Sequence, residues 1–293
     1  MRGFAQTLIL GLLFGGVYAL LASGLTVIFG VMRIVNIAHG ALMILGAFIT
    51  YTLWRYAGLD PFLGLIITMI VMFWIGWVLY MVIVRPVRRA PLTTTVLLTF
   101  GLAFFVEGVM GFIWSNNIAA ARPWYADYSF HLGSLYFPAN MLFGCALAVV
   151  IFVALQIVFS KTWLGRAMRA SASNEDVARL VGVKISTVAA LTFALGAAGA
   201  GAGGSIISVM VAFVPGSQIL WLTRMLSIVV LGGLGSVPGA VVAALILGVS
   251  EALVATYILP IWSPVVSMLF IFIVLLLRPQ GLFGTKLRED VAQ

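Results

Sequence analysis

Long stretches almost free of charged side chains constrain this fold more than any other feature of the sequence. A helix needs about 20 apolar residues to cross the hydrocarbon core of a bilayer. Runs of about that length cover residues 5–30, 37–54, 61–84, 92–114, 139–159, 185–211, 223–257 and 261–277. The run at 223–257 is broken by glycines and could cross once or twice. The sequence therefore predicts an all-α, polytopic transmembrane bundle of roughly 8–10 spans with broken helices.

The chain has too few charged residues to form the surface of a separate soluble domain. Only 8% of the residues are charged, whereas about a quarter is usual for a chain whose surface faces water. We therefore expect residues 1–293 to form a single transmembrane domain. The net charge of +8 would suggest nucleic acid in a soluble protein, but orientation in the membrane and anionic lipid explain it here. Membrane lipid, and no nucleic acid, is the expected partner.

Basic residues predict the orientation, because loops rich in Lys and Arg stay on the cytoplasmic side. Three clusters stand out: Arg85, Arg88 and Arg89; Lys161, Arg166, Arg169, Arg179 and Lys184; and Arg278, Lys286 and Arg288. All three clusters lie on the same side of the membrane only if residues 223–257 cross the membrane twice and turn near 232–239. Arg33 then lies inside, while Arg2, Arg55, Arg122 and Arg224 lie outside. This arrangement places the amino terminus and the loop 115–138 outside, and the carboxyl terminus in the cytoplasm.

Two segments interrupt their apolar runs in a similar way. Residues 29–40 contain Arg33, Asn36 and His39 before Gly40, and residues 231–239 contain Gly232, Gly233 and Gly235 before Pro238. Irregular backbone at membrane depth lines a cavity or is buried in protein. Paired broken helices in corresponding halves point to a transport path and to an internal repeat. These residues are therefore path candidates, and tight cytoplasmic turns remain the alternative.

Glu107 and Glu251 are the acidic residues within the predicted spans. An acid at the membrane centre costs a few kcal/mol unless it is solvated or paired, so each is a functional candidate. For both acids we favour structural hydrogen bonding, with a role in the path as the alternative; Glu107 is therefore kept among the path candidates. His39 has no second ligand nearby in the sequence, so we expect no metal site.

Glycine and alanine fill residues 196–204, which read GAAGAGAGG. Small side chains allow helix backbones to approach closely in a membrane. We expect this segment to pack against other helices of the same chain, in preference to a dimer interface or a substrate path.

Residues 161–184 form a polar, basic segment between two spans. A soluble partner could bind to this segment. Ser173 with Asp176 predicts a capped helix start and Gly182 a left-handed stop, so we expect a short helix over 174–181. Its residues Glu175, Asp176 and Arg179 should point outward, and Gly165, Arg166 and Arg169 precede it. A plain solvated loop is the alternative.

Four blocks of this sequence together resemble the branched-chain amino acid ABC importer permeases of the LivH type. They are 36–40 (NIAHG) with 45–47 (LGA), 165–170 (GRAMRA) with 178–182 (ARLVG), 232–239 (GGLGSVPG) and 277–284 (LRPQGLFG). The resemblance implies a bacterial inner-membrane permease that works with a second, LivM-like permease, two ATP-binding subunits and a periplasmic binding protein. It also implies that 161–184 couples the permease to the ATP-binding subunits.

The chain has no G-x-x-x-x-G-K-[ST] loop, so ATP and Mg would be used by partner subunits and this chain would bind no cofactor. It would be a transport subunit and not an enzyme. Leucine, isoleucine and valine are the expected substrates. The alternative is a stand-alone ion-coupled transporter or channel that uses Glu107 and Glu251. An intramembrane enzyme ranks last, because the sequence lacks a paired acid, metal or Ser-His constellation.

Overall fold

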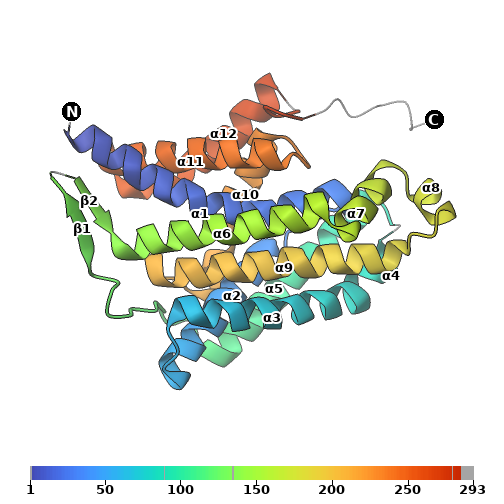
Figure 1. The fold of residues 1–293 in the computed structure, drawn as a ribbon, viewed down its shortest axis with the longest axis horizontal. Helices are drawn as coiled ribbons and strands as arrows, with labels where there is room; N and C mark the ends of the chain where they lie inside the picture. Colours follow the sequence, from blue (N-terminus) through green and yellow to red (C-terminus); the bar gives the residue numbers. More distant parts are fainter. Residues whose placement is uncertain (1, 89, 134, 279, 285–293) are drawn as a thin grey trace.

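The computed structural model describes residues 2–88, 90–133, 135–278 and 280–284 and shows a bundle of long helices (Figure 1). In that part of the chain, seven helical segments are long and apolar enough to cross a membrane. They contain α1 (Arg2–Met32), α3 (Pro61–Leu79), α5 (Leu92–Trp114), α6 (Ala139–Lys161), α9 (Ile185–Met210), α11 (Val237–Tyr257) and α12 (Ser263–Leu277). The segment with α3 continues to Val87, and the segment with α12 begins at Pro260. Two shorter or more polar helices, α2 (His39–Ala57) and α10 (Gln218–Gly232), occupy further predicted spans. The predicted polytopic helical bundle is confirmed.

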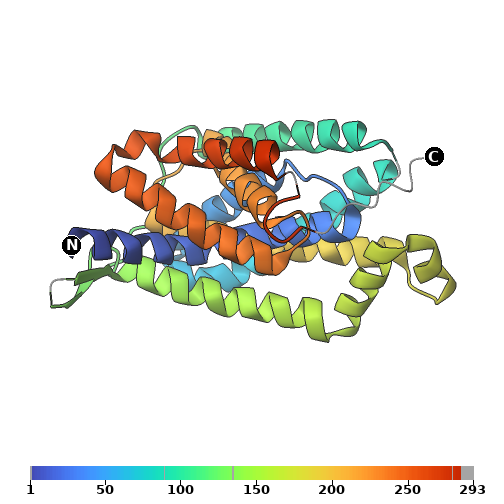
Figure 2. The ribbon, with the colours of Figure 1, turned by 90° about the horizontal axis from the view of Figure 1, so that it is seen from above.

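Helix α9 occupies the centre of the bundle and contacts α1, α2, α3 and α6 (Figures 1 and 2). Its glycines allow these contacts. A Cβ atom on Gly46 of α2 would lie 2.5 Å from the Cα atom of Gly201, which is closer than real Cβ contacts allow. Residues 196–204 are buried throughout. The prediction that this segment packs within the chain is therefore confirmed.

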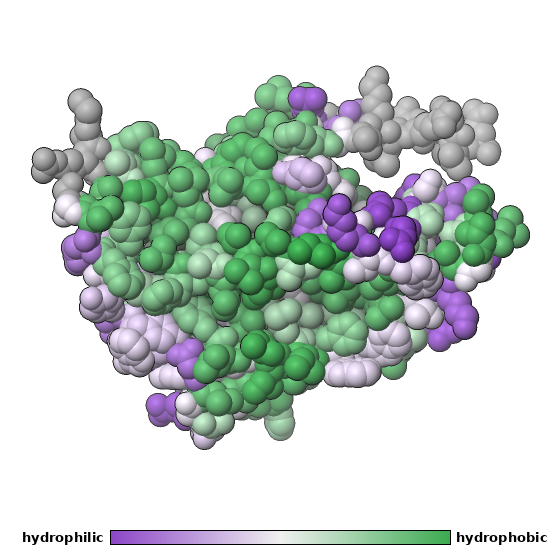
Figure 3. Space-filling view, in the orientation of Figure 1, coloured by the Kyte–Doolittle hydropathy of each residue, from purple (hydrophilic) through white to green (hydrophobic). Residues whose placement is uncertain are grey.

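The two ends of the bundle differ in chemistry. One end carries the start of α1 and a hairpin of β1 (Ser129–Leu132) and β2 (Leu135–Pro138), in which Phe130 pairs with Phe137. The opposite end carries α4 (Arg85–Val87), α7 (Trp163–Ser173) and α8 (Glu175–Leu180), and we call it the α7–α8 end (Figure 1). Hydrophilic side chains gather at the α7–α8 end, whereas hydrophobic ones cover much of the bundle between the ends (Figure 3).

The basic clusters follow this division. Arg85, Arg88 and the basic residues of α7 and α8 lie at the same end, as the orientation rule requires (Figure 1). Arg89, Lys286 and Arg288 lie outside the described residues. The 232–239 turn separates α10 from α11, as the two-crossing arrangement predicts. Which side of the membrane each end faces stays a prediction.

The loop 115–138 is ordered by contacts at the hairpin end. The side-chain amide of Gln6 donates to the carbonyl oxygen of Tyr136 at 2.7 Å, and the Tyr136 amide donates back to Gln6 at 3.0 Å. The Tyr125 hydroxyl donates to Asp60 at 3.2 Å, and its ring stacks on Phe62. Burial and the Asp60 carboxylate raise the pKa of Tyr125 above its ordinary value. The two-stranded hairpin itself was not predicted.

Candidate functional site

The first chain break separates α1 from α2 and is held by α5. Helix α1 ends at Met32, and Arg33 adopts a positive φ of 53°, which stops the helix. The backbone then runs without helical structure to the start of α2. The Thr99 hydroxyl donates to the Val35 carbonyl at 3.1 Å and accepts from the Ile37 amide at 3.3 Å. A side chain of α5 thus satisfies backbone groups that a helix would have satisfied internally.

Asn36 and His39 in this break are completely buried. Neither side-chain polar atom of Asn36 has a hydrogen-bond partner among the described residues, and the same is true of Nδ1 of His39. Nε2 of His39 lies 3.3 Å from the carbonyl oxygen of Leu21. Buried polar groups without partners are rare in proteins and each needs a cause. Contact with a polar substrate during transport would explain why these polar atoms have no partner in the part of the protein that the structure describes.

The second break lies between α10 and α11. Gly233 and Gly235 adopt φ values of 98° and 83°, where a side chain would be strained. The Ser236 hydroxyl caps α11 by accepting from the Gly239 amide at 3.2 Å. Gly232, by contrast, has helical backbone and packs directly against Gly239. Each of these residues is therefore accounted for by a turn or by a close approach of backbones.

The two breaks meet at the α7–α8 end of the bundle. A Cβ atom on Gly30 would lie 3.3 Å from the Cα atom of Gly235, so the end of α1 touches the second turn. The segment after α12 also reaches this turn. Its Leu282 amide donates to the Leu231 carbonyl at 2.8 Å, and its Phe283 amide donates to the Gly232 carbonyl at 3.1 Å. The structure thus brings together three segments far apart in the sequence.

Glu107 belongs to the group around the first break. The Gln218 side-chain amide donates to its carboxylate at 2.8 Å, which joins α5 to the start of α10. Gly40 of α2 packs on the same Gln218, because a Cβ atom there would lie 2.5 Å from its carbonyl oxygen. Oε1 of Gln218 has no partner among the described residues. Gly40 and Glu107 therefore lie along one seam between α2, α5 and α10, which we call the polar seam. The His39 ring faces Leu21 and Gly24 of α1 instead, and Asn36 lies in the first break next to the backbone groups that Thr99 binds.

Glu251 lies outside this seam, in a separate network. Its carboxylate accepts hydrogen bonds from Arg224, Tyr18 and Ser267, on α10, α1 and α12. Arg224, which was predicted to lie on the outer side, is part of α10 and is paired with Glu251; the side of the membrane that it faces stays a prediction. The prediction missed the pair because 27 residues separate the partners.

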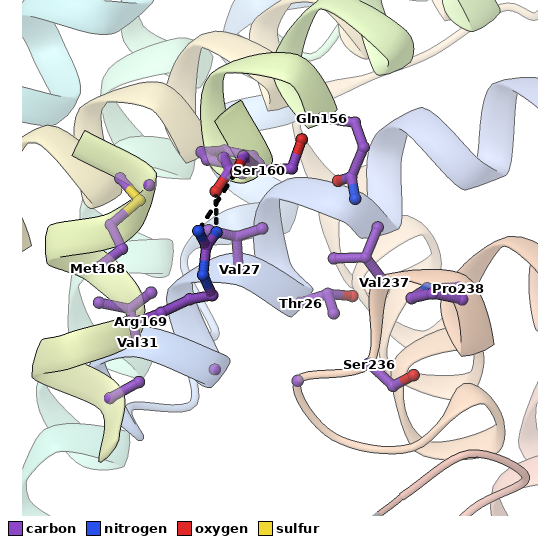
Figure 4. A pocket seen from close by; sticks show the side chains of 15 residues that line it. Thr26, Val27, Val31, Gln156, Ser160, Met168, Arg169, Ser236, Val237 and Pro238 are labelled. Carbon is purple, nitrogen blue, oxygen red and sulfur yellow. Dashed lines mark hydrogen bonds between the residues drawn. The ribbon is translucent and has the colours of Figure 1, made fainter. Parts of the chain in front are cut away.

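Helix α7 is attached rigidly to the end of α6. Gly165 lies so close to α6 that any Cβ atom would overlap the Phe159 carbonyl oxygen. The Arg169 guanidinium donates to the carbonyl oxygens of Phe159 at 2.5 Å and of Ser160 at 3.3 Å (Figure 4). Arg169 thereby caps the last turn of α6. Arg166 is exposed, and its guanidinium donates to the Lys161 carbonyl at 3.3 Å.

The predicted cap of the next helix is wrong by one residue. Ser173 ends α7, and Asn174 caps α8 by accepting from the amides of Asp176 and Val177 at 3.0 and 3.1 Å. Asn and Ser are equally good caps, so the sequence alone does not choose between neighbours. Gly182 does adopt the predicted left-handed conformation, with φ at 85°.

The charged residues of α8 are only partly directed outward. Asp176 has an exposed side chain and Arg179 a half-exposed one, but Glu175 forms an ion pair with Arg88 at the end of α4. The Glu175 side chain is 40% exposed, as predicted for an outward position, but its carboxylate is paired, which the sequence did not predict. The outer face of α8 is instead apolar: Val177, Leu180 and Val181 are 55%, 86% and 74% exposed.

A cavity of about 390 Å³ connects α7 with the second break. Met168 and Arg169 line one wall, while Thr26 of α1, Gln156 of α6 and Ser236 surround the other side (Figure 4). The cavity therefore lies between the segment at the α7–α8 end and the place where both chain breaks meet. A movement of α7 would change its shape.

Several of these side chains were not predicted. Gln218, Thr99 and Arg224 make the contacts that organise the polar seam and the Glu251 network. Thr99 carries no signal in the sequence, because threonine is common in membrane helices. Gln218 follows the short 3₁₀ turn η2 (Pro215–Ser217), and a polar amide at that position could have been noticed as the start of a helix inside the membrane.

Comparison with known proteins gives a consistent result over nearly the whole chain. Residues 7–278 match the family described as "Branched-chain amino acid transport system / permease component". The chain is 31% identical to the high-affinity branched-chain amino acid transport system permease protein BraD of Pseudomonas aeruginosa, over 98% of both chains. It is 29% identical to the corresponding protein LivH of Salmonella typhimurium, again over 98% of both.

A more distant relative is the probable branched-chain amino acid transport permease protein LivH of Methanocaldococcus jannaschii, at 24% identity over 93% of this chain and 90% of the relative. No solved structure matches the chain.

Proposed function

Because this chain belongs to the family of branched-chain amino acid transport permease components, we propose that it forms part of the path of an ATP-driven importer for leucine, isoleucine and valine. It is a multi-pass membrane protein and a permease component. Its partners in the proposal are a second, LivM-like permease, two ATP-binding subunits and a periplasmic substrate-binding protein. The membrane is the bacterial inner membrane, with the α7–α8 end in the cytoplasm.

The attachment of α7 to α6 carries this proposal. Gly165 and Arg169 hold α7 directly against the end of the membrane helix α6, while α8 exposes Val177, Leu180 and Val181 beyond it. The exposed apolar patch on α8 suits the binding of a soluble partner, and α7 would transmit a movement of that partner to α6. We propose that ATP-binding subunits dock on residues 161–184 and that their closure tilts α6. ATP and Mg²⁺ would be bound by those subunits.

The path in this proposal follows the polar seam and the two breaks. Asn36, His39 and Gln218 offer buried polar atoms that have no partner in the described part of the chain, and a zwitterionic amino acid could use them. Gly40 keeps α2 and α10 close, and Gly232, Gly233 and Gly235 form the turn where the breaks meet at the α7–α8 end. Substrate delivered at the hairpin end would pass along this seam.

The stand-alone, ion-coupled alternative finds less support. Such a transporter needs acids that are free to bind a proton or a cation. Glu251 is instead paired with Arg224 and hydrogen-bonded by Tyr18 and Ser267, and Glu107 accepts from Gln218. Both acids have structural partners, so the ATP-driven importer is the better account.

Uptake of radiolabelled leucine separates the two accounts. We expect cells that produce this chain with its partner permease, binding protein and ATP-binding subunits to accumulate leucine. A Lys→Ala substitution in the ATP-binding loop of the partners should abolish accumulation, because that lysine contacts the phosphates of ATP. Uptake that persists in that variant and collapses when the proton gradient is dissipated would support the ion-coupled transporter instead.

A further inference from the structure

A basic cavity lies at the α7–α8 end, on a different side from the cavity beside Arg169. Its volume is about 610 Å³, and it opens between the π-helical turn η1 (Tyr80–Val84), which continues α3, and the start of α9. Four basic side chains line it: Arg85, Arg88, Arg179 and Lys184. Among the residues that the structure describes, no acidic side chain is part of its wall.

The acids beside this cavity do not balance its charge. Glu175 forms an ion pair with Arg88 and lies 3.7 Å from Arg179, and Asp176 lies 3.7 Å from Arg179. Both carboxylates belong to the first turn of α8. Arg85 and Lys184 make no ion pair with an acid in the described part of the chain. The cavity therefore presents net positive charge, which suits an anionic ligand.

A buried hydroxyl adds a hydrogen-bond donor to this charge. Tyr80 is completely buried and lines the cavity, and its hydroxyl lies near the Arg88 guanidinium but donates to no acceptor among the described residues. An unpaired buried hydroxyl is costly unless a ligand satisfies it. An oxygen-rich anion in the cavity would accept this hydrogen bond.

The start of α9 points to the same kind of ligand. This helix has 26 residues, and Lys184 at its N-cap makes no side-chain capping bond. The first amides of a helix and its macrodipole together favour a phosphate group. The hydroxyls of Ser186 and Thr187 also line the cavity beside these amides.

An apolar stripe on α3 leads to the cavity from the membrane. Trp74, Val78 and Val82 are spaced four residues apart and are 60%, 54% and 67% exposed. Met81 and Arg85 continue α3 into the cavity wall. A lipid tail lying along this stripe would place its headgroup beside Arg85.

We propose that this cavity binds the phosphate headgroup of an anionic phospholipid, whose acyl chain lies along Trp74, Val78 and Val82. Basic pockets between membrane helices at the cytoplasmic side are suited to such headgroups. The adjoining apolar stripe favours a lipid over free phosphate. The ion pair of Arg88 with Glu175 connects this site to α8, so a bound lipid would help to order the segment that carries the proposed docking surface.

Native mass spectrometry of the full chain in mild detergent tests this site. The chain is titrated with phosphatidylglycerol, with phosphatidylcholine and with inorganic phosphate. We expect phosphatidylglycerol to be retained, and phosphatidylcholine and phosphate to be lost at the same concentration. Arg85→Gln and Lys184→Gln should each weaken phosphatidylglycerol binding about fivefold. Arg278→Gln is the matched control, because it removes a basic residue that does not line the cavity.

Tyr80→Phe separates a specific site from a merely basic surface, because it removes the hydroxyl and leaves every charge in place. We expect weaker phosphatidylglycerol retention, together with an unchanged or higher melting temperature in phosphatidylcholine. Equal retention in Tyr80→Phe, Arg85→Gln and Arg278→Gln would overturn the proposal. Displacement of phosphatidylglycerol by inorganic phosphate at an equal concentration would also overturn it. Loss of the lipid when ATP-binding subunits are added would do the same, because those subunits would then be what occupies the cavity.

Discussion

Nε of Arg224 on α10 lies 3.0 Å from Oε1 of Glu251 on α11, inside the membrane-spanning bundle. The Tyr18 hydroxyl donates to the same carboxylate at 2.6 Å and the Ser267 hydroxyl at 2.8 Å. The guanidinium also lies 4.9 Å from the centre of the Trp221 ring. One carboxylate thus connects α1, α10, α11 and α12, and it holds the short helix α10 in place.

Breaking this pair should destabilise the bundle. Glu251→Gln leaves the buried Arg224 without its counter-ion, and we expect a loss of about 3–5 kcal/mol, seen as a lower melting temperature in detergent. Removing both charges with Arg224→Met and Glu251→Gln should recover much of that loss, because no unpaired charge remains. If the double variant melts as low as the single one, the pair does not stabilise the chain through its charge.

The contact between Gly30 and Gly235 should not tolerate side chains. Gly235→Ala introduces a Cβ atom at a positive φ and 3.2 Å from the Cα atom of Gly30, so we expect a cost of about 1–3 kcal/mol. Gly101→Ala on α5 is the control, because nothing lies within 4 Å of its added Cβ atom. Thermal unfolding measures both variants. Equal melting temperatures would show that the two breaks need not touch.

Asn36 distinguishes a transport path from packing. Removing its unpartnered amide should leave stability unchanged or raise it, since a buried polar group without a partner is lost. If substrate contacts the amide, Asn36→Ala and His39→Ala should each lower leucine uptake about tenfold, the effect of losing one hydrogen bond of about 1.4 kcal/mol. Unchanged uptake in variants that fold and assemble would remove both residues from the path.

Arg169 tests whether α7 and α6 move together. Arg169→Ala removes the cap on the α6 carbonyls, so α7 could move without α6. We expect the complex to assemble and hydrolyse ATP while leucine uptake per ATP falls. Arg166→Ala is the neighbouring control, because Arg166 is exposed. A coupling ratio that changes equally in both variants would contradict a specific role of Arg169.

Much of the fold was predictable because the membrane restricts the possible structures. Helix α5 matches its predicted range 92–114, since Pro91 begins it and the apolar run stops before Ser115. The 231–239 glycines likewise predicted the end of α10. The contacts of the polar seam and the first break were harder to predict from the sequence. Asn36 and His39 were found as polar residues in an apolar run, whereas the contacts of Gln218 with Glu107 and of Thr99 with the first break join distant segments.

The α7–α8 segment was likewise predictable only in its local features. Its polarity predicted a surface helix, and Gly182 predicted where it stops. The assignment of the cap to Ser173 failed because α7 continues through that residue, and the attachment to α6 through Gly165 has no local signal. The internal repeat and the single domain over 1–293 stay predictions.

Affinity purification of the tagged chain from native membranes in mild detergent tests the central claim most directly. All co-purifying chains are identified by mass spectrometry, for the wild type, for Leu180→Glu on the exposed face of α8, and for Leu132→Glu on the exposed hairpin at the other end. We predict that the wild type and Leu132→Glu retain ATP-binding subunits and a second permease. Leu180→Glu should lose the ATP-binding subunits and keep the second permease. Recovery of equal amounts of ATP-binding subunits with all three, or of none with the wild type, would contradict docking at α8.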